Sequence, residues 1–152
     1  MLLTWWRRYV CGVRRDRQRV TEAIAVAAMF SGLPSTLHAL RTGGSFRSAI
    51  RYVYDATCAV GTLVPPGRPA FVRGAIVHLG ISVAFGEALA RMLPERRSVV
   101  WGAAAGLAIG LINVGMIGRR FPAIRALPLL PQLADNVAFG LLFAAVADRR
   151  HE

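Results

Sequence analysis

The chain has 152 residues and a formal net charge of +11, yet 55% of its residues are hydrophobic. All 19 basic residues are arginines, set against 8 acidic residues. A single domain of this length and composition is either a basic nucleic-acid-binding module or a small membrane protein.

The positions of the charges decide between these two classes. Four apolar segments contain only Glu87, Arg91 and Asp135 as charged residues. These segments are 23–40, 74–93, 98–118 and 126–147. Because every helix of a soluble domain needs a polar face, this segregation of charge predicts a membrane protein. The arginines are spread over several connecting segments instead of one surface, so no nucleic-acid partner is expected.

The first predicted element is an Arg-rich arm, residues 1–19. Its apolar residues recur at helical spacing, with arginines on the opposite face. This pattern predicts an amphipathic interfacial helix, anchored by aromatic rings and facing anionic lipids. The anchors are Trp5, Trp6, Arg7, Arg8, Arg14 and Arg15. An unstructured basic tail is the alternative, because Gly12 weakens a helix.

Four membrane spans follow the arm, each with about 20 mostly apolar residues. The predicted spans are about 20–40, 71–93, 98–118 and 128–147. They predict an all-α fold, a polytopic membrane helix bundle over residues 20–148. The segment 46–64 is shorter and ends at Pro65 and Pro66. We expect this segment to be interfacial or re-entrant, with a fifth span as the alternative.

The distribution of arginines predicts the orientation. With the N-terminus inside, 11 arginines face the cytoplasm and 8 face outward, and six of the 11 precede the first span. The positive-inside rule therefore places both termini, including the tail 149–152, in the cytoplasm of a multi-pass cell-membrane protein. Cys11 and Cys58 then lie on opposite sides of the membrane, so no disulfide framework is expected.

Two segments of the chain are similar to each other. Residues 78–86 (HLGISVAFG) and 132–140 (QLADNVAFG) share five of nine positions. We expect two copies of a two-span hairpin, related by an axis along the membrane normal. Small residues at every fourth position let membrane helices pack closely. The predicted packing positions are Gly32, Gly74, Ser82, Gly86, Gly102, Gly106, Gly110 and Gly140.

Six polar residues within or beside the spans form the candidate ligand or proton site. They are His78, Asp135, His38, Asn113, Asn136 and Gln132. Ionisable groups inside a membrane indicate function by default. His78 with Asp135 suggests a proton-coupled or cation site, because an imidazole titrates near neutral pH. Interhelical hydrogen bonds that hold the helices in register are the favoured alternative.

The spacing of charged and metal-ligating residues along the sequence predicts whether they form metal sites or ion pairs. His38, His78 and Asp135 have no recognised metal-ligand spacing, so neither a metal nor a cofactor is expected. Glu87 and Arg91 are four residues apart on one helix, which predicts an ion pair at the rim of the bundle.

Two proline-containing motifs carry a family resemblance. They are GLPSTLHAL at 32–40, and RRFPAIRALP at 119–128, which leads into PQLAD at 131–135. The chain resembles a family of small, uncharacterised integral-membrane proteins of GC-rich bacteria over most of residues 20–147. In that family a histidine often follows the aspartate, where this chain has Asn136. The resemblance implies the four-span architecture and carries no activity.

Enzymatic signatures are missing from the sequence: it contains no Gly-x-Ser-x-Gly, no His-Glu-x-x-His and no phosphate-binding glycine loop. A lipid-acting enzyme with Ser82 as nucleophile lacks an activating group, so no catalytic activity is expected. We predict a non-enzymatic accessory or interaction protein, either a homo-oligomer or the partner of another membrane protein. The alternative is a small proton- or cation-coupled transporter or channel subunit that uses His78 and Asp135.

Overall fold

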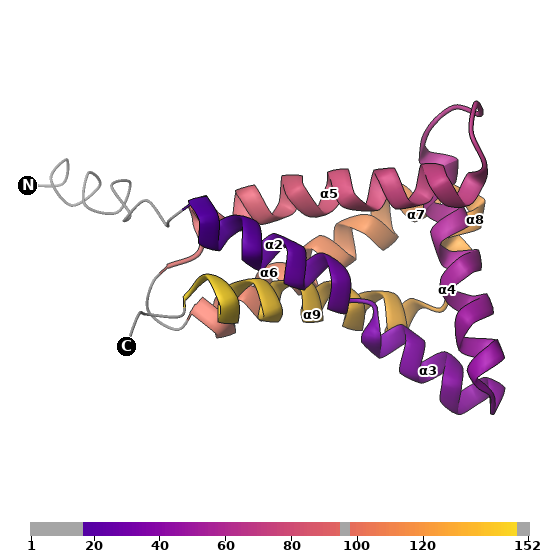
Figure 1. Cartoon of the computed structure of the whole chain (residues 1–152), viewed down its shortest axis with the longest axis horizontal. Helices are drawn as coiled ribbons and strands as arrows, with labels where there is room; N and C mark the ends of the chain where they lie inside the picture. The colour runs from indigo at the N-terminus through magenta and orange to yellow at the C-terminus, as the bar shows by residue number, and fades with distance from the viewer. Residues whose placement is uncertain (1–16, 95–97, 149–152) are drawn as a thin grey trace, which may run out of the picture.

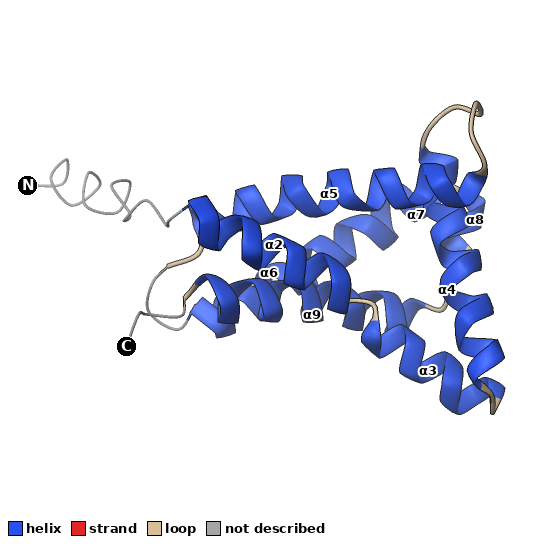
Figure 2. Ribbon diagram, in the orientation of Figure 1, coloured by secondary structure: helices blue, strands red, loops and turns tan. Residues whose placement is uncertain are grey.

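Helices make up nearly all of the computed structural model, which describes residues 17–94 and 98–148. In chain order the α-helices are α2 (Arg17–Phe30), α3 (Leu33–Gly43), α4 (Phe46–Val60), α5 (Ala70–Met92), α6 (Ser98–Ile112), α7 (Gly118–Arg120), α8 (Pro122–Arg125) and α9 (Leu129–Ala147). A 3-10 turn, η1 (Gly61–Leu63), follows α4, and a π-helical turn, η2 (Asn113–Ile117), joins α6 to α7. The described residues contain no strand (Figure 2), which confirms the predicted all-α class.

Four helical segments are long and apolar enough to cross a membrane, as the sequence predicts. They are Arg17–Gly43, Ala70–Met92, Ser98–Arg120 and Leu129–Ala147. The first comprises α2 and α3 with a break between them, and the third comprises α6, η2 and α7. Each begins or ends within a few residues of the predicted span.

The break in the first segment follows from its sequence. Pro34 lacks the amide hydrogen that a continuing helix needs, but it is tolerated in the first turn of a new helix. The hydroxyl of Thr36 donates to the carbonyl oxygen of Gly32 at 2.7 Å, and that of Ser35 donates to the same oxygen at 3.2 Å. The chain therefore ends α2 at Phe30 and begins α3 at Leu33.

Helix α4 is separated from α3 by a tight turn. Gly44 ends α3 in the left-handed conformation, with φ of 66°, which a residue without a Cβ adopts readily. Ser45 then caps α4, because its hydroxyl accepts a hydrogen bond from the amide of Ser48 at 3.2 Å. Helix α4 runs across one end of the bundle (Figure 1), and we call this the α4 end. The predicted segment 46–64 is thus α4 with η1, and its interfacial position stays a prediction.

The long helices lie side by side and alternate in direction, so α2 begins and α9 ends at the end opposite α4 (Figure 1). Helix α9 contacts α2, α3, α5 and α6, and it packs most extensively against α6. The apolar core gathers at the opposite end around Phe143, which is fully buried, with Phe139 and Leu89 beside it. Towards the α4 end, the first segment and α5 diverge and α4 bridges them.

Glycines set the distance between α6 and α9. A Cβ built on Gly102 would collide with the carbonyl oxygen of Gly140, and one built on Gly106 would collide with that of Asn136. The reverse contact holds as well, since a Cβ on Gly140 would meet the carbonyl of Gly102. The two backbones therefore touch directly, as small-residue interfaces between membrane helices do.

The other predicted packing positions have mixed environments. Gly74 faces the backbone of Thr57 on α4, Gly86 faces the side chain of Ile24 on α2, and Ser82 is buried. A Cβ on Gly110 would lie 3.0 Å from the nearest Leu133 carbon. Gly32 differs from the prediction: no atom lies within 4 Å of a Cβ built there, because it occupies the break and not an interface.

The two predicted hairpins pack differently. Helices α6 and α9 contact each other along their length, whereas the first segment and α5 are held apart at the α4 end. The packing does not support an equivalence of the hairpins, and the internal repeat stays a prediction.

Two predicted parts lie outside the described residues: residues 1–16 of the arm and the tail 149–152. The arm's predicted anchors are among them, namely Trp5, Trp6, Arg7, Arg8, Arg14 and Arg15. Residues 17–19 form the first turn of α2.

Candidate functional site

The candidate polar site lies around the break between α2 and α3. Asp135, on α9, accepts a hydrogen bond through Oδ1 from the amide of Ser35 at 2.9 Å. Ser35 is in the first turn of α3, where amide hydrogens have no partner within the helix and the helix dipole favours a negative charge. Asp135 therefore caps α3 from a neighbouring helix, in a place where Gly32 supplies no capping side chain.

His78, on α5, contacts the other side of the same break. Its Nε2 lies 3.2 Å from the carbonyl oxygen of Ala28, in the last turn of α2. Carbonyl groups in a last helical turn lack intrahelical partners, and the His78 tautomer with its hydrogen on Nε2 donates to this one. The His78 side chain remains exposed at the surface of the bundle.

The direct His78–Asp135 pair that the sequence suggests is not formed. No hydrogen bond or ion pair joins the two side chains within residues 17–94 and 98–148, because each has its own backbone partner. The structure thus brings both to one feature, the broken first segment, from α5 and from α9.

Helix α4 adds Tyr52 to this site. Burial raises the pKa of the Tyr52 phenol above its ordinary value and the nearby charge of Asp135 raises it further, whereas a hydrogen bond with Ser35 opposes the increase. The phenol therefore keeps its proton at neutral pH. The sequence did not indicate Tyr52, because helical periodicity alone does not tell which face of α4 meets the bundle.

The three amide side chains form a chain of hydrogen bonds beside this site. Asn113 donates through Nδ2 to Oδ1 of Asn136 at 3.1 Å, and Asn136 donates to the carbonyl of Gln132 at 2.8 Å. Gln132 in turn donates to the carbonyl of Leu127 at 2.9 Å. These bonds tie η2 to the start of α9, while Oδ1 of Asn113 is buried and accepts no hydrogen bond from the described residues.

His38 lies on α3 with an exposed side chain, and nothing described joins it to His78 or Asp135. Across the described ranges, no three His, Cys, Asp or Glu side chains are grouped in a way that could hold a metal ion. At the opposite end of the bundle, Arg91 donates to the Glu87 carboxylate at 2.8 Å, which confirms the predicted ion pair.

The arrangement has two chemical capabilities. First, Asp135 and His78 stabilise helix ends whose backbone groups would otherwise be unpaired. In an apolar setting, each unpaired backbone group costs on the order of several kcal/mol. A helix broken beside ionisable side chains is also the arrangement with which secondary transporters bind ions.

Comparison of the chain with protein-family models, with curated proteins and with solved structures found no match. The resemblance to small integral-membrane proteins of GC-rich bacteria stays a prediction.

Proposed function

We propose that the chain is a multi-pass membrane protein with a non-enzymatic accessory or interaction role. The observation that carries this proposal is the apolar outer surface of the four long segments. In the most apolar stretch of each segment, only 17% to 28% is buried within the chain. Ile76, Leu79 and Val83 on α5 are each at least half exposed, as are Trp101 and Leu111 on α6. Continuous apolar faces of this kind need lipid or a protein partner to cover them.

The polar residues support a structural role for the bundle interior. Asp135 and His78 each bond to a backbone group of another helical segment, and Asn113 on η2 bonds to the side chain of Asn136 on α9. A side chain engaged in this way holds helices in register. In this proposal the protein acts through its surface, as a homo-oligomer or as the partner of another membrane protein, with both termini in the cytoplasm.

Membrane fractionation tests the proposal. The full chain is expected to sediment with membranes and to stay there after an alkaline carbonate wash, because four apolar segments insert into the hydrocarbon core. Release by the wash would contradict it. Crosslinking in intact membranes then tests the interaction role, and a chain that crosslinks neither to itself nor to another membrane protein would contradict that part.

A proton- or cation-coupled transporter is the second candidate, and the broken first segment favours it. Secondary transporters bind ions at discontinuous helices whose ends face charged groups, and here Asp135 and His78 lie at the two sides of the break. The third segment is irregular as well, since it contains the π-helical turn η2 (Asn113–Ile117).

Proton flux distinguishes the two candidates. The full chain is reconstituted into vesicles that contain a pH-sensitive dye, and a potassium gradient with valinomycin drives proton entry. A transporter would acidify the vesicles faster than protein-free controls, and Asp135→Asn would abolish the difference. Flux equal to that of protein-free vesicles at every pH would overturn the proton-coupled form of the second candidate.

A further inference from the structure

We propose that the groove beneath α4 binds one acyl chain of an anionic phospholipid, with the phosphate held by Arg47 and Arg51. The proposal rests on the membrane location proposed above and adds a specific lipid site to it. It concerns the α4 end of the molecule, so it is independent of the predicted N-terminal arm.

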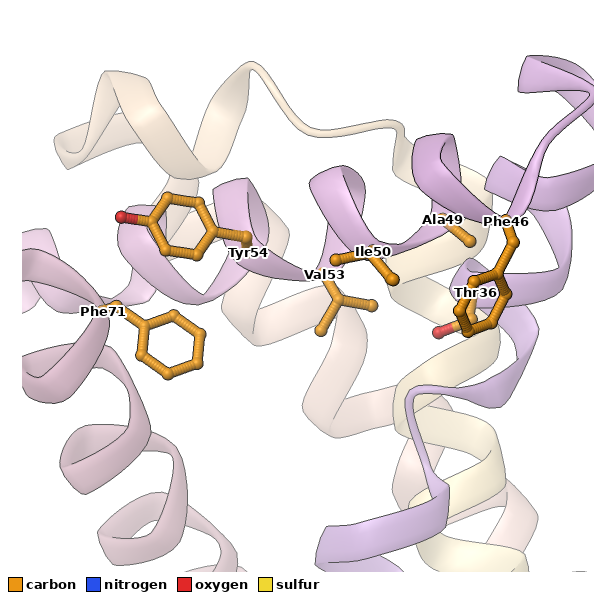
Figure 3. A pocket seen from close by; sticks show the side chains of 7 residues that line it. All are labelled: Thr36, Phe46, Ala49, Ile50, Val53, Tyr54 and Phe71. Atoms are coloured by element: carbon orange, nitrogen blue, oxygen red, sulfur yellow. The ribbon is translucent and has the colours of Figure 1, made fainter.

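The groove has a volume of about 350 Å³ and lies between α3, α4 and α5. Figure 3 shows side chains of α4, among them Phe46, Ile50 and Val53, on the side of the helix that faces this space. Thr36 of α3 and Phe71 of α5 complete the lining. The hydroxyl of Thr36 is already bonded to Gly32, so the groove presents an apolar surface to a ligand.

The lining residues are exposed although they are apolar. Phe46 is 74% exposed and Ile50 is 55% exposed, and both lie on the same face of α4. On α5, Phe71 stacks on Tyr54 with ring centroids 5.2 Å apart, which fixes one wall of the groove. The volume is at the lower end of the range for ligand pockets, about 300–1,000 Å³, which suits a segment of a single acyl chain.

Arginines border the groove on the outer side of α4. Arg47 follows Phe46 and Arg51 follows Ile50, so the two arginines form a row next to the apolar row, one turn of helix apart. The side chain of Arg51 is 85% exposed, and its nearest acidic group, on Asp55, is 3.9 Å away. An exposed ion pair of this length contributes little, so both guanidinium groups are available to a phosphate.

The charge of the whole α4 end favours an anionic headgroup over a zwitterionic one. Eight arginines lie on the helices and turns of this end, with Asp55 as the exposed acidic residue among those described. The arginines are Arg41, Arg47, Arg51, Arg68, Arg73, Arg119, Arg120 and Arg125. Basic pockets beside membrane helices bind anionic headgroups, and each arginine contributes about 1 kcal/mol, or about fivefold in affinity.

Native mass spectrometry of the full chain, purified from membranes in a non-ionic detergent, tests the site. The chain is titrated with phosphatidylglycerol and with phosphatidylcholine of identical acyl chains. We expect phosphatidylglycerol to be retained at least fivefold better, and Arg47→Gln to reduce that preference about fivefold. Arg17→Gln is the matched control, because Arg17 is also an exposed arginine in a first helical turn, at the opposite end.

A second pair of variants tests the groove itself. Val53→Trp fills the groove and is expected to lower the retention of both lipids severalfold, whereas Val83→Trp, at a similarly exposed valine of α5, leaves it unchanged. Arg47→Lys keeps a positive charge and is expected to retain most of the preference.

Several results would overturn the proposal: equal retention of the two lipids, equal losses in Arg47→Gln and Arg17→Gln, or a dimer in which a second copy covers the groove and excludes lipid. A chain that fails to fractionate with membranes would overturn the proposed membrane function instead, so the two failures are distinguishable.

Discussion

At the scale of single residues, two ionisable side chains of the candidate spans have defined backbone partners. Asp135 supplies an acceptor to the first turn of α3, and His78 reaches the last turn of α2. Both side chains therefore compensate for a break that Pro34 and Gly32 introduce. Placing an ionisable group in an apolar setting costs free energy. The hydrogen bonds to backbone groups at the break, which would otherwise lack partners, offset that cost.

Replacement of Asp135 tests this role. Asp135→Ala leaves the Ser35 amide without its acceptor, and we expect a loss of about 2 kcal/mol in the free energy of unfolding, measured by denaturation in detergent. Asp135→Asn keeps an acceptor oxygen and is expected to lose less than half of that. Asp55→Ala removes an exposed carboxylate and serves as the control, with no measurable change. Equal losses for the Ala and Asn variants at position 135 would exclude the hydrogen bond as the source.

At the scale of elements, the interface between α6 and α9 is the most extensive contact of the bundle. It depends on glycines whose missing Cβ atoms let one backbone lie on the other. The first segment and α5 do not pack together along their whole length, because α4 lies between their ends. Gly74 of α5 therefore packs against α4 instead of a long helix. Closely similar small-residue patterns thus produce one tight pair and one open pair.

Gly106→Ala tests the tight pair. The added methyl group meets the carbonyl of Asn136, which moves only if the helices separate, so we expect a loss of about 1–3 kcal/mol in stability. Gly80→Ala is the matched control: it lies inside α5 with no atom within 4 Å of the new Cβ, and it should gain about 0.5–1 kcal/mol from helix propensity. Thermal unfolding of both variants in the same detergent makes the comparison, and a Gly106→Ala variant as stable as the parent would contradict the close approach.

At the scale of the whole molecule, the chain has two distinct ends: the α4 end and the opposite end. Helix α2 begins and α9 ends on one side, whereas α4, α7 and α8 lie on the other (Figure 1). Four antiparallel segments therefore put the start of α2 and the end of α9 on the same side of any membrane they cross. The predicted orientation, which follows from the positive-inside rule, places that side in the cytoplasm.

Thiol labelling tests the orientation. In a background in which Cys11 and Cys58 are replaced by serine, Arg17→Cys marks the start of α2 and Gly67→Cys marks the loop before α5, where nothing lies within 4 Å of a new Cβ. A membrane-impermeant maleimide added to intact cells is expected to label Gly67→Cys and to label Arg17→Cys only after permeabilisation. The opposite pattern would reverse the orientation, and labelling of both in intact cells would contradict four spans.

The sequence by itself determined the helical class and the four long apolar segments, because charge segregation and segment length are properties of composition along the chain. It also singled out Asp135, His78 and the glycines of α6 and α9, but not the backbone groups that Asp135 and His78 contact. The tertiary structure decided how they are used. Asp135 and Ser35 are distant in the sequence, and only the packing of α9 against the break brings them together. The same holds for the groove beneath α4. The sequence predicts only a short interfacial or re-entrant segment there, and three-dimensional packing decides which of its faces meets the bundle and which stays open.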